Sequence, residues 1–169
     1  MTKVFIDGSA GTTGLRIRER LGERNDVTLI TLPEELRKDA NARKEALNSC
    51  DIAFLCLPDD AARESVSLIE NTSTVVIDTS TAHRTLDGWV YGFPELSSKH
   101  FENIQKSKRI AVPGCHASGF IALVYPLIEA KVISNDILLS SHSITGYSGG
   151  GKKMIAEYES NDRPDAFSS

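Results

Sequence analysis

Short apolar runs alternate with amphipathic stretches along the first 80 residues. Strands are expected where β-branched and aromatic residues cluster, at residues 3–7, 27–32, 51–57 and 75–78. Helices are expected between them, at residues 15–21, within the polar run 33–48, and at residues 61–70. The third strand is apolar almost throughout, so both of its faces should be buried. The alternation predicts an α/β fold with a doubly wound parallel sheet that helices cover on both sides.

The pattern changes in the second half of the chain. Residues 83–108 are rich in loop-forming residues, and the strand-like run 109–112 ends at Pro113-Gly114. A helix is expected over residues 115–131, and Pro126 inside it should kink or divide it. A further strand is expected over residues 137–144, and the polar residues 160–169 complete no element. A tail of this size has little core of its own, so we expect the chain to be cut short.

Composition narrows the class of protein. The chain has 169 residues, of which 40% are hydrophobic and 25% charged, as in folded globular proteins. The net charge of −4 creates no basic field, so neither nucleic acid nor an anionic membrane is expected as a partner. No apolar run reaches the roughly 18 residues of a transmembrane helix, and strand-like sequence begins at Lys3, so no signal peptide is expected. Three cysteines, an odd number without motif spacing, favour a reducing cytoplasm.

A glycine-rich turn separates the first expected strand from the first expected helix. It consists of Gly8, Ser9, Ala10, Gly11, Thr12, Thr13 and Gly14, in a G-x-x-G-x-x-G spacing. Glycine permits a tight turn close to a pyrophosphate, and a helix beginning near Thr12 directs free N–H groups at phosphate. The same glycines would also suit a plain turn, but their place after the first strand favours a Rossmann fold. We therefore predict that these seven residues bind a dinucleotide cofactor.

The end of the second strand bears on which dinucleotide binds. NAD-binding folds usually carry an acidic residue there, which binds the ribose hydroxyls. Here the strand ends in residues 30–33 (ITLP), and Arg37 and Lys38 follow Glu34 and Glu35. The pattern favours NADP(H), with Arg37 and Lys38 as candidate partners of the 2′-phosphate. A solvated charged helix is the alternative interpretation of these two residues.

Cys115 is the strongest candidate nucleophile. It follows Pro113-Gly114 at an expected strand-to-helix turn, where unpaired helix N–H groups stabilise a thiolate. Thiolate is the nucleophilic form of cysteine, so the location suits covalent catalysis, although a buried packing residue would give the same pattern. Cys50 and Cys56 bound or lie within an apolar strand and are expected to be small core residues.

The histidines offer no comparable signal. His116 is adjacent to Cys115, but neighbouring side chains at a helix start diverge, so His116 is not favoured as the general base. His83, His100 and His142 are scattered and are expected to be surface or strand histidines. Cys115 and His116 have no second cluster at ligand spacing, so no metal site is expected.

Several segments together resemble a known family. They are the glycine turn and residues 54–59 (FLCLPD), 78–84 (DTSTAHR), 92–96 (GFPEL), 113–115 (PGC) and 146–152 (GYSGGGK). Their order and spacing resemble the shorter sequence type of N-acetyl-gamma-glutamyl-phosphate reductase, a family related to aspartate-semialdehyde dehydrogenase. The resemblance implies an NADP-dependent reductase of arginine biosynthesis. In this reaction the Cys115 thiolate attacks an acyl phosphate, forms a thioester, and the thioester is reduced to a semialdehyde.

The resemblance also implies roles for further residues. Arg84 would bind the leaving phosphate, since a guanidinium is always charged and bidentate. Ser80 would contact the cofactor. Backbone N–H groups of Ser148, Gly149 and Gly150 would hold the acyl oxygen or the substrate carboxylate. A plain surface arginine and a flexible glycine turn are the alternatives.

The resemblance finally implies two domains. Residues 1–114 would form an NADP-binding Rossmann domain, and residues 115–169 the beginning of an incomplete α+β catalytic and dimerisation domain. Family members are considerably longer, form homodimers or homotetramers through this domain, and carry their catalytic histidine downstream of the last residue here. Aspartate-semialdehyde dehydrogenase and a non-catalytic nucleotide-binding fragment are the alternative functions.

Overall fold

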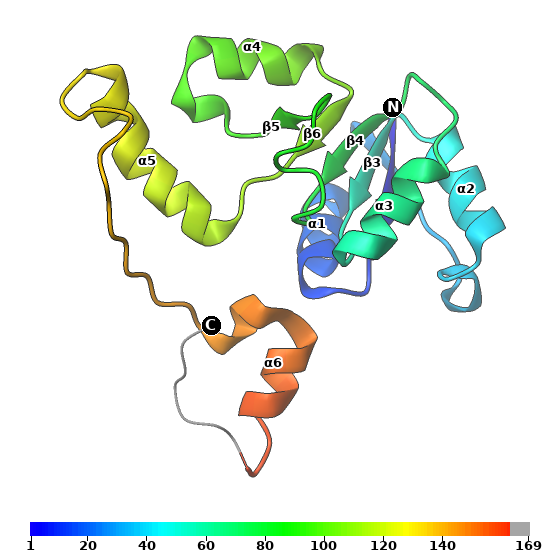
Figure 1. Ribbon diagram of the computed structural model, residues 1–169. Coiled ribbons are helices and arrows are strands. Elements are labelled where there is room, and N and C mark those ends of the chain that lie inside the picture. Colours follow the sequence, from blue (N-terminus) through cyan, green and yellow to red (C-terminus); the bar gives the residue numbers. More distant parts are fainter. Residues whose placement is uncertain (163–169) are drawn as a thin grey trace.

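The computed structural model describes residues 1–162 and contains a six-stranded parallel sheet (Figure 1). The strands are β1 (Thr2–Asp7), β2 (Val27–Ile30), β3 (Ile52–Leu55), β4 (Val75–Asp78), β5 (Val90–Tyr91) and β6 (Arg109–Ala111). They lie in the order β2-β1-β3-β4-β6-β5, and every pairing is parallel. β2 lies on one side of β1 and β3 lies on the other. The carboxyl ends of β1 and β3 therefore form the switch point of a Rossmann fold.

Helices connect the strands. They are α1 (Thr12–Gly22), α2 (Ala40–Ser49), α3 (Asp59–Ser67), α4 (Ser98–Lys106), α5 (Cys115–Glu129) and α6 (Gly151–Tyr158), with 3-10 turns η1 (Glu34–Leu36), η2 (Pro94–Leu96) and η3 (Tyr147–Gly150). Right-handed crossovers put α1 on one face of the sheet and α2 and α3 on the other (Figure 1). Asp39 caps α2 by accepting the Ala42 N–H at 2.8 Å, and Ser97 caps α4 through the His100 N–H.

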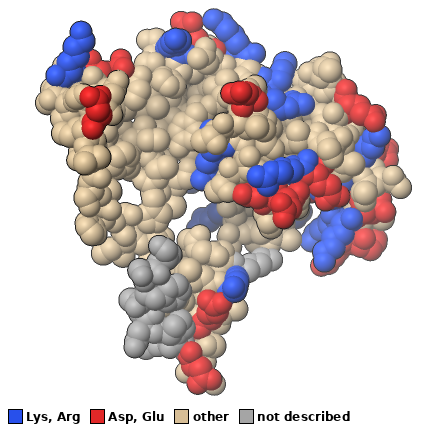
Figure 2. Space-filling model, in the orientation of Figure 1, with Lys and Arg blue, Asp and Glu red and all other residues tan. Residues whose placement is uncertain are grey.

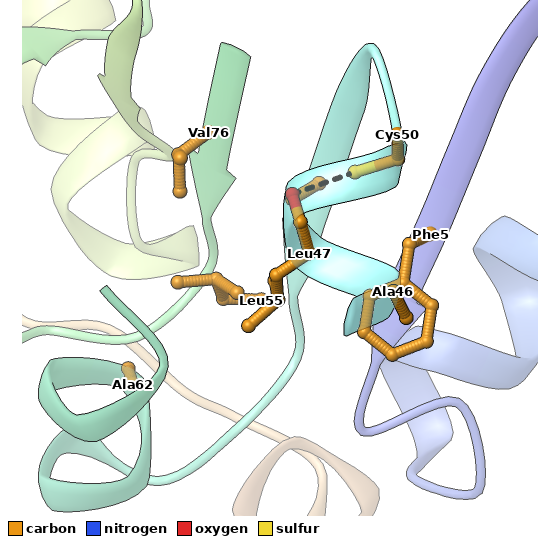
Figure 3. Packing of buried hydrophobic residues seen from close by; sticks show 8 residues of the cluster. Phe5, Ala46, Leu47, Cys50, Leu55, Ala62 and Val76 are labelled. Carbon is orange, nitrogen blue, oxygen red and sulfur yellow. Dashed lines mark hydrogen bonds between the residues drawn. The ribbon is translucent and has the colours of Figure 1, made fainter. Parts of the chain in front are cut away.

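The core lies between the sheet and the helices α2 and α3. Ala53, Leu55 and Val76 from β3 and β4 are fully buried against Leu47 of α2 and Ala62 of α3. Phe5, Ala46 and Cys50 complete this cluster, and the Cys50 thiol donates to the Leu47 carbonyl at 3.4 Å (Figure 3). The end of β1 is buried continuously from Val4 to Asp7, whereas buried and half-buried residues alternate along β3 and β4, so the expected burial of both faces of the third strand is only partly met. The Cys50 side chain is therefore a core residue, as predicted.

The prediction of a doubly wound Rossmann sheet is confirmed. All four early strands and the three helices between them form, with bounds that shift by a few residues, and β6 begins at Arg109 as expected. Two short elements in the loop-rich segment were not predicted. β5 spans two residues at the sheet edge, and α4 begins at the serine cap Ser97.

The predicted strand over residues 137–144 is wrong. The whole segment is non-helical and unpaired, and Leu138 and Ile144 are 97% and 100% exposed. A strand needs a neighbour for its backbone hydrogen bonds, and no described strand lies beside this segment. Pro126 does not divide α5, which runs without a break from Cys115 to Glu129. The expected polar end over residues 160–169 lies mostly outside the described residues.

Charged side chains are distributed unevenly. Figure 2 shows Lys, Arg, Asp and Glu mixed over the part of the surface that covers the sheet, whereas α5 and the segment after it are largely uncharged. Among the described helices, none is both long enough and apolar enough to cross a membrane.

Candidate active site

The glycine turn after β1 is held by close backbone contacts. Gly8 has φ +85°, and a side chain there would put its Cβ 2.2 Å from the Cys56 carbonyl oxygen, at the end of β3. A Cβ at Gly14 would lie 2.4 Å from the Gly8 carbonyl oxygen, so α1 packs directly on the turn. Only glycine fits either position, because the first needs left-handed backbone and both need space. Gly11 meets no such contact at its Cβ position, so its role is not steric.

Helix α1 begins at this turn with its first amides uncapped. Gly11 is the N-cap residue, and no side chain accepts a hydrogen bond from the first turn. Thr12 and Thr13 are exposed at the same place. An uncapped helix start combines free N–H donors with the positive end of the helix dipole, which suits a phosphate group.

A cavity of about 1080 Å³ extends from the glycine turn along the ends of β1 and β2. Gly8, Ser9 and Ala10 line one end of it, and the segment from Leu29 to Glu35 lines the other. Its size and its position at the switch point fit a dinucleotide. Gly11, Thr12, Thr13 and Gly14 of the predicted cofactor-binding set belong to the same turn but are not lining residues.

Four cationic side chains line this cavity, and one of them, Arg43, is paired with Asp7. Arg37 and Lys38, the predicted 2′-phosphate partners, both line it, and so does Arg18 of α1. The Nε atom of Arg37 is buried and has no hydrogen-bond partner among the described residues. A buried guanidinium nitrogen without an acceptor fits a site for an anionic oxygen. Arg18 was missed from sequence, although it lies one helical turn beyond Gly14.

A buried ion pair lies directly beside the glycine turn. The Asp7 carboxylate, directly before Gly8, accepts hydrogen bonds from Arg43 Nε and Nη2 at 3.2 and 3.1 Å and from the Ser65 hydroxyl at 2.8 Å. Arg43 Nη2 also donates to Ser65, and Arg43 Nη1 lies 3.5 Å from Glu64. These contacts fix the carboxyl end of β1. Sequence reasoning placed Arg43 only within a polar run, because its partner is 36 residues away.

Cys115 is exposed and is the first residue of α5. Gly114 is the N-cap, and no side chain caps the first turn, so the expected free amides are present beside the thiol. Cys50 and Cys56 differ sharply, because burial raises the pKa of each of these thiols to about 11. Cys56 is half-buried at the end of β3 and is less enclosed than Cys50. Of the three cysteines, Cys115 is the most exposed to solvent.

Arg84 lies against the turn that precedes Cys115. Its Nε donates to the Val112 carbonyl at 3.0 Å, and its Nη2 donates to the Thr79 carbonyl at 3.3 Å. A Cβ at Gly114 would stand 2.6 Å from Arg84 Nη1, so the guanidinium is in contact with the backbone next to the cysteine. The structure therefore brings two predicted residues, Arg84 and Cys115, to the same place.

Other predicted site residues are not gathered there. Ser148, Gly149 and Gly150 form the turn η3 before α6, and they do not line the cavity of about 490 Å³ beside Cys115 and residues 139–145. Figure 1 shows α6 separated from the sheet. His116 lines this cavity, and its Nδ1 pairs with the Ser143 hydroxyl.

Ser80 and His83 are buried near the end of β4. The Ser80 hydroxyl donates to Asp78 at 2.6 Å and accepts the Ala82 N–H at 3.2 Å. The expectation that His83 is a surface or strand histidine is wrong, since it is 3% exposed in a loop and pairs with Asp78. The pairing could have been suspected from the five-residue spacing to the strand-terminal aspartate. The described residues contain no group of three or more His, Cys, Asp or Glu side chains arranged to hold a metal ion.

The sequence is similar to those of known enzymes. The chain is 56% identical to N-acetyl-gamma-glutamyl-phosphate reductase from Chelativorans sp. (strain BNC1), over 98% of this chain and 54% of that protein. It is 53% identical to the enzyme of the same name from Burkholderia orbicola (strain MC0-3), over 94% of this chain and 51% of that protein. The chain thus spans about half the length of the curated relatives it matches.

The fold is similar to that of aspartate semialdehyde dehydrogenase from Francisella tularensis, with a TM-score of 0.67 and 19% identity over 93% of this chain and 48% of that one. Residues 115–169 match the family model described as semialdehyde dehydrogenase, dimerisation domain. Residues 3–104, more than half of the chain, match the model described as semialdehyde dehydrogenase, NAD binding domain. The chain therefore belongs to the semialdehyde dehydrogenase family.

Proposed function

We propose that this chain carries the cofactor site and the nucleophile of an NADP-dependent N-acetyl-gamma-glutamyl-phosphate reductase. The observation that carries the proposal is the contact of the Arg84 guanidinium with the backbone beside the exposed Cys115. A nucleophile next to a fixed cation suits an acyl phosphate, because the group that leaves is an anion. Relatives of that name are 53% and 56% identical, which supports this substrate over aspartyl phosphate.

The chemistry follows from these two residues. The Cys115 thiolate attacks the acyl carbon, the bond from carbon to the phosphate oxygen breaks, and phosphate departs toward Arg84. The free amides at the start of α5 favour the thiolate before attack. NADPH, when bound, would supply a hydride to the acyl carbon of the thioester. Breaking of the carbon–sulfur bond then releases the semialdehyde and returns Cys115 as thiolate.

Cofactor binding is assigned to the glycine turn, residues 8–14, and to Ser80. Besides the paired Arg43, the cavity is lined by the cations Arg37, Lys38 and Arg18, and the buried unpaired Nε of Arg37 supports an extra phosphate there. NADP(H) differs from NAD(H) by that 2′-phosphate. The preference for NADP(H) is therefore part of the proposal.

The second half of the chain has a proposed role in substrate binding and assembly. Ser148, Gly149 and Gly150 are the proposed substrate-facing turn, in which the Gly149 N–H already bonds the Gly146 carbonyl at 2.9 Å. Residues 1–114 and 115–169 are proposed as separate domains of a cytoplasmic homodimer or homotetramer.

The acylation step can be tested without the hydride transfer. The chain is mixed with N-acetyl-gamma-glutamyl phosphate, and Cys115 is examined for a thioester by peptide mass spectrometry while released phosphate is measured. We expect one acyl group and one phosphate per chain, and neither with Cys115→Ala. Faster acylation by aspartyl phosphate, or no acylation of Cys115 by either compound, contradicts the proposed function.

The cofactor preference needs a separate measurement. Calorimetric titration should give at least about tenfold tighter binding of NADP⁺ than of NAD⁺, because a charge-assisted pair of this kind contributes roughly 1.5 kcal/mol or more. Arg37→Met should remove most of this difference and leave NAD⁺ binding nearly unchanged. Equal affinities in the unaltered chain would show that the 2′-phosphate is not recognised.

A further inference from the structure

A buried polar cluster precedes Arg84 in the chain, and its members Asp78 and His83 have no role in the proposed function. Asp78, the last residue of β4, accepts three hydrogen bonds on its carboxylate. They come from the Ser80 N–H at 3.0 Å, the Ser80 hydroxyl at 2.6 Å and the His83 imidazole at 2.6 Å. Asp78 is 0% exposed. A carboxylate oxygen only accepts hydrogen bonds, so Nδ1–H of His83 is the donor.

The His83 ring is held from a second direction. It stacks on Trp89, with ring centroids 4.1 Å apart and an angle of 14° between the planes. Trp89 packs on the main hydrophobic core. The loop from Thr79 to Trp89 is therefore fixed in its interior by one hydrogen-bonded and stacked imidazole. Stability of the fold alone does not explain the buried Asp78–His83 pair, because well-packed apolar residues at these positions would stabilise the fold at least as well.

The cluster connects to the turn before Cys115 by two routes. Along the chain, His83 precedes Arg84, whose Nε donates to the Val112 carbonyl. Through the sheet, the Asp78 carbonyl accepts the Val112 N–H at 2.7 Å. Both polar groups of Val112 are thus bonded to Asp78 and Arg84, three residues before the nucleophile.

We propose that His83, anchored by Asp78 and Ser80, is a positioning residue that holds the Arg84 guanidinium beside Cys115 to receive the leaving phosphate. This inference rests on the proposed function, because it assigns Arg84 to the phosphate. The geometry gives the imidazole no contact with the reacting atoms, so it acts only through Arg84. Without the Asp78–His83 bond, the loop loses its interior anchor and the guanidinium no longer stays against Gly114.

The test uses two reagents that alkylate the same thiol. Iodoacetate is an anion and iodoacetamide is neutral, so the ratio of their rates at Cys115 reports the positive charge nearby. Rates are followed by peptide mass spectrometry of Cys115. Arg84→Met should lower the ratio about fivefold, the size expected for a nearby unit charge that is partly exposed to water. His83→Phe keeps a ring on Trp89 but loses the bond to Asp78, and it should lower the ratio at least about twofold.

A destabilised control separates positioning from folding. Leu47→Ala weakens the distant core and should leave the ratio at its original value, whatever it does to the melting temperature. If Arg84→Met lowers the ratio and His83→Phe does not, the positioning role is overturned while the proposed function stands. If Arg84→Met itself leaves the ratio unchanged, the role of Arg84 in the proposed function fails as well, and the inference with it.

A measurement on the unaltered chain covers the case in which His83→Phe does not fold. Nitrogen-15 NMR should find His83 Nδ1 protonated and its proton exchanging with water much more slowly than the imidazole protons of the exposed His116. An unprotonated Nδ1, or equally fast exchange at both histidines, would show that the Asp78–His83 bond is not maintained and would overturn the inference.

Discussion

The sheet-bearing part, residues 2–111, and the part from Cys115 to Asp162 bury their apolar side chains to very different degrees. The first contains every buried hydrophobic residue of the described chain. In the second, no described side chain is buried, and Phe120, Leu123 and Leu127 of the apolar helix α5 are all exposed. Burial of apolar surface is the main favourable term in folding, so the first part provides most of the stability.

The two parts also contribute differently to the proposed site. The glycine turn follows β1 and the Cys115 turn follows β6, so both turns of the proposed site are positioned by the first part. Cys115 itself begins the second part, yet its location depends on Val112, which is bonded to Asp78 and Arg84. The proposed nucleophile of the less buried part is thus positioned by the sheet, just beyond the end of β6.

The largest effect is expected at the ion pair under the glycine turn. Arg43→Met leaves the Asp7 carboxylate buried without its cation, and it should lower the free energy of unfolding by about 4 kcal/mol. Urea denaturation followed by circular dichroism measures it. Lys106→Ala, which removes the exposed pair with Glu102 on α4, should change stability by less than about 0.5 kcal/mol.

A double variant sharpens this prediction. Asp7→Ala combined with Arg43→Met should cost clearly less than the sum of the two single changes, because the unpaired charge is gone. Strict additivity would mean that Asp7 and Arg43 do not stabilise each other. The arrangement of the buried side chains beside the glycine turn would then need another explanation.

The next effect compares a core leucine with a leucine of α5. Leu47→Ala leaves a cavity beneath the sheet and should lower the free energy of unfolding by about 3 kcal/mol. Leu123→Ala, at a position 74% exposed, should lower it by less than about 0.5 kcal/mol. Both values come from the same urea experiment. Comparable losses at the two positions would mean that α5 is buried in solution and would break the comparison between the parts.

The smallest expected effect is a difference in alkylation rate between Cys115 and the other two cysteines. The pKa of Cys50 and Cys56 is raised to about 11, so the protonated thiol persists at pH 8 and the nucleophilic thiolate appears only as the pH approaches 11. Iodoacetamide at pH 8 should label both much more slowly than the exposed Cys115, and each pH unit below 11 should change the rates at Cys50 and Cys56 about tenfold. Labelling of Cys56 as fast as Cys115 would mean that the end of β3 is open.

Local patterns carried most of the fold. The apolar runs at β1, β3 and β4 predicted buried parallel strands, and the glycine spacing predicted the turn that Gly8 and Gly14 require. These features involve residues near one another in sequence, where backbone preferences and burial act without distant partners. β5 and α4 were missed because two residues and one serine cap give too weak a pattern.

Only part of the candidate site could be predicted from local sequence patterns. Cys115 and Arg84 were proposed as separate motifs, and their proximity depends on hydrogen bonds that Val112 makes with Arg84 and with Asp78. Arg43 was not recognised, because its partner Asp7 is 36 residues away at the end of β1. His83 was not recognised either, although its partner Asp78 is only five residues away at the end of β4. Charge and polarity alone do not say which distant group a side chain meets.

What this sequence determined by itself is the set of local structures whose causes are local: strands from continuous apolar runs, a left-handed turn from Gly8, and a helix start at Cys115 after Pro113-Gly114. Tertiary structure decided which of these meet. It set Arg84 against Gly114 and buried His83 on Asp78. It also left residues 137–144 unpaired, because a strand forms only where a neighbouring strand supplies its hydrogen bonds.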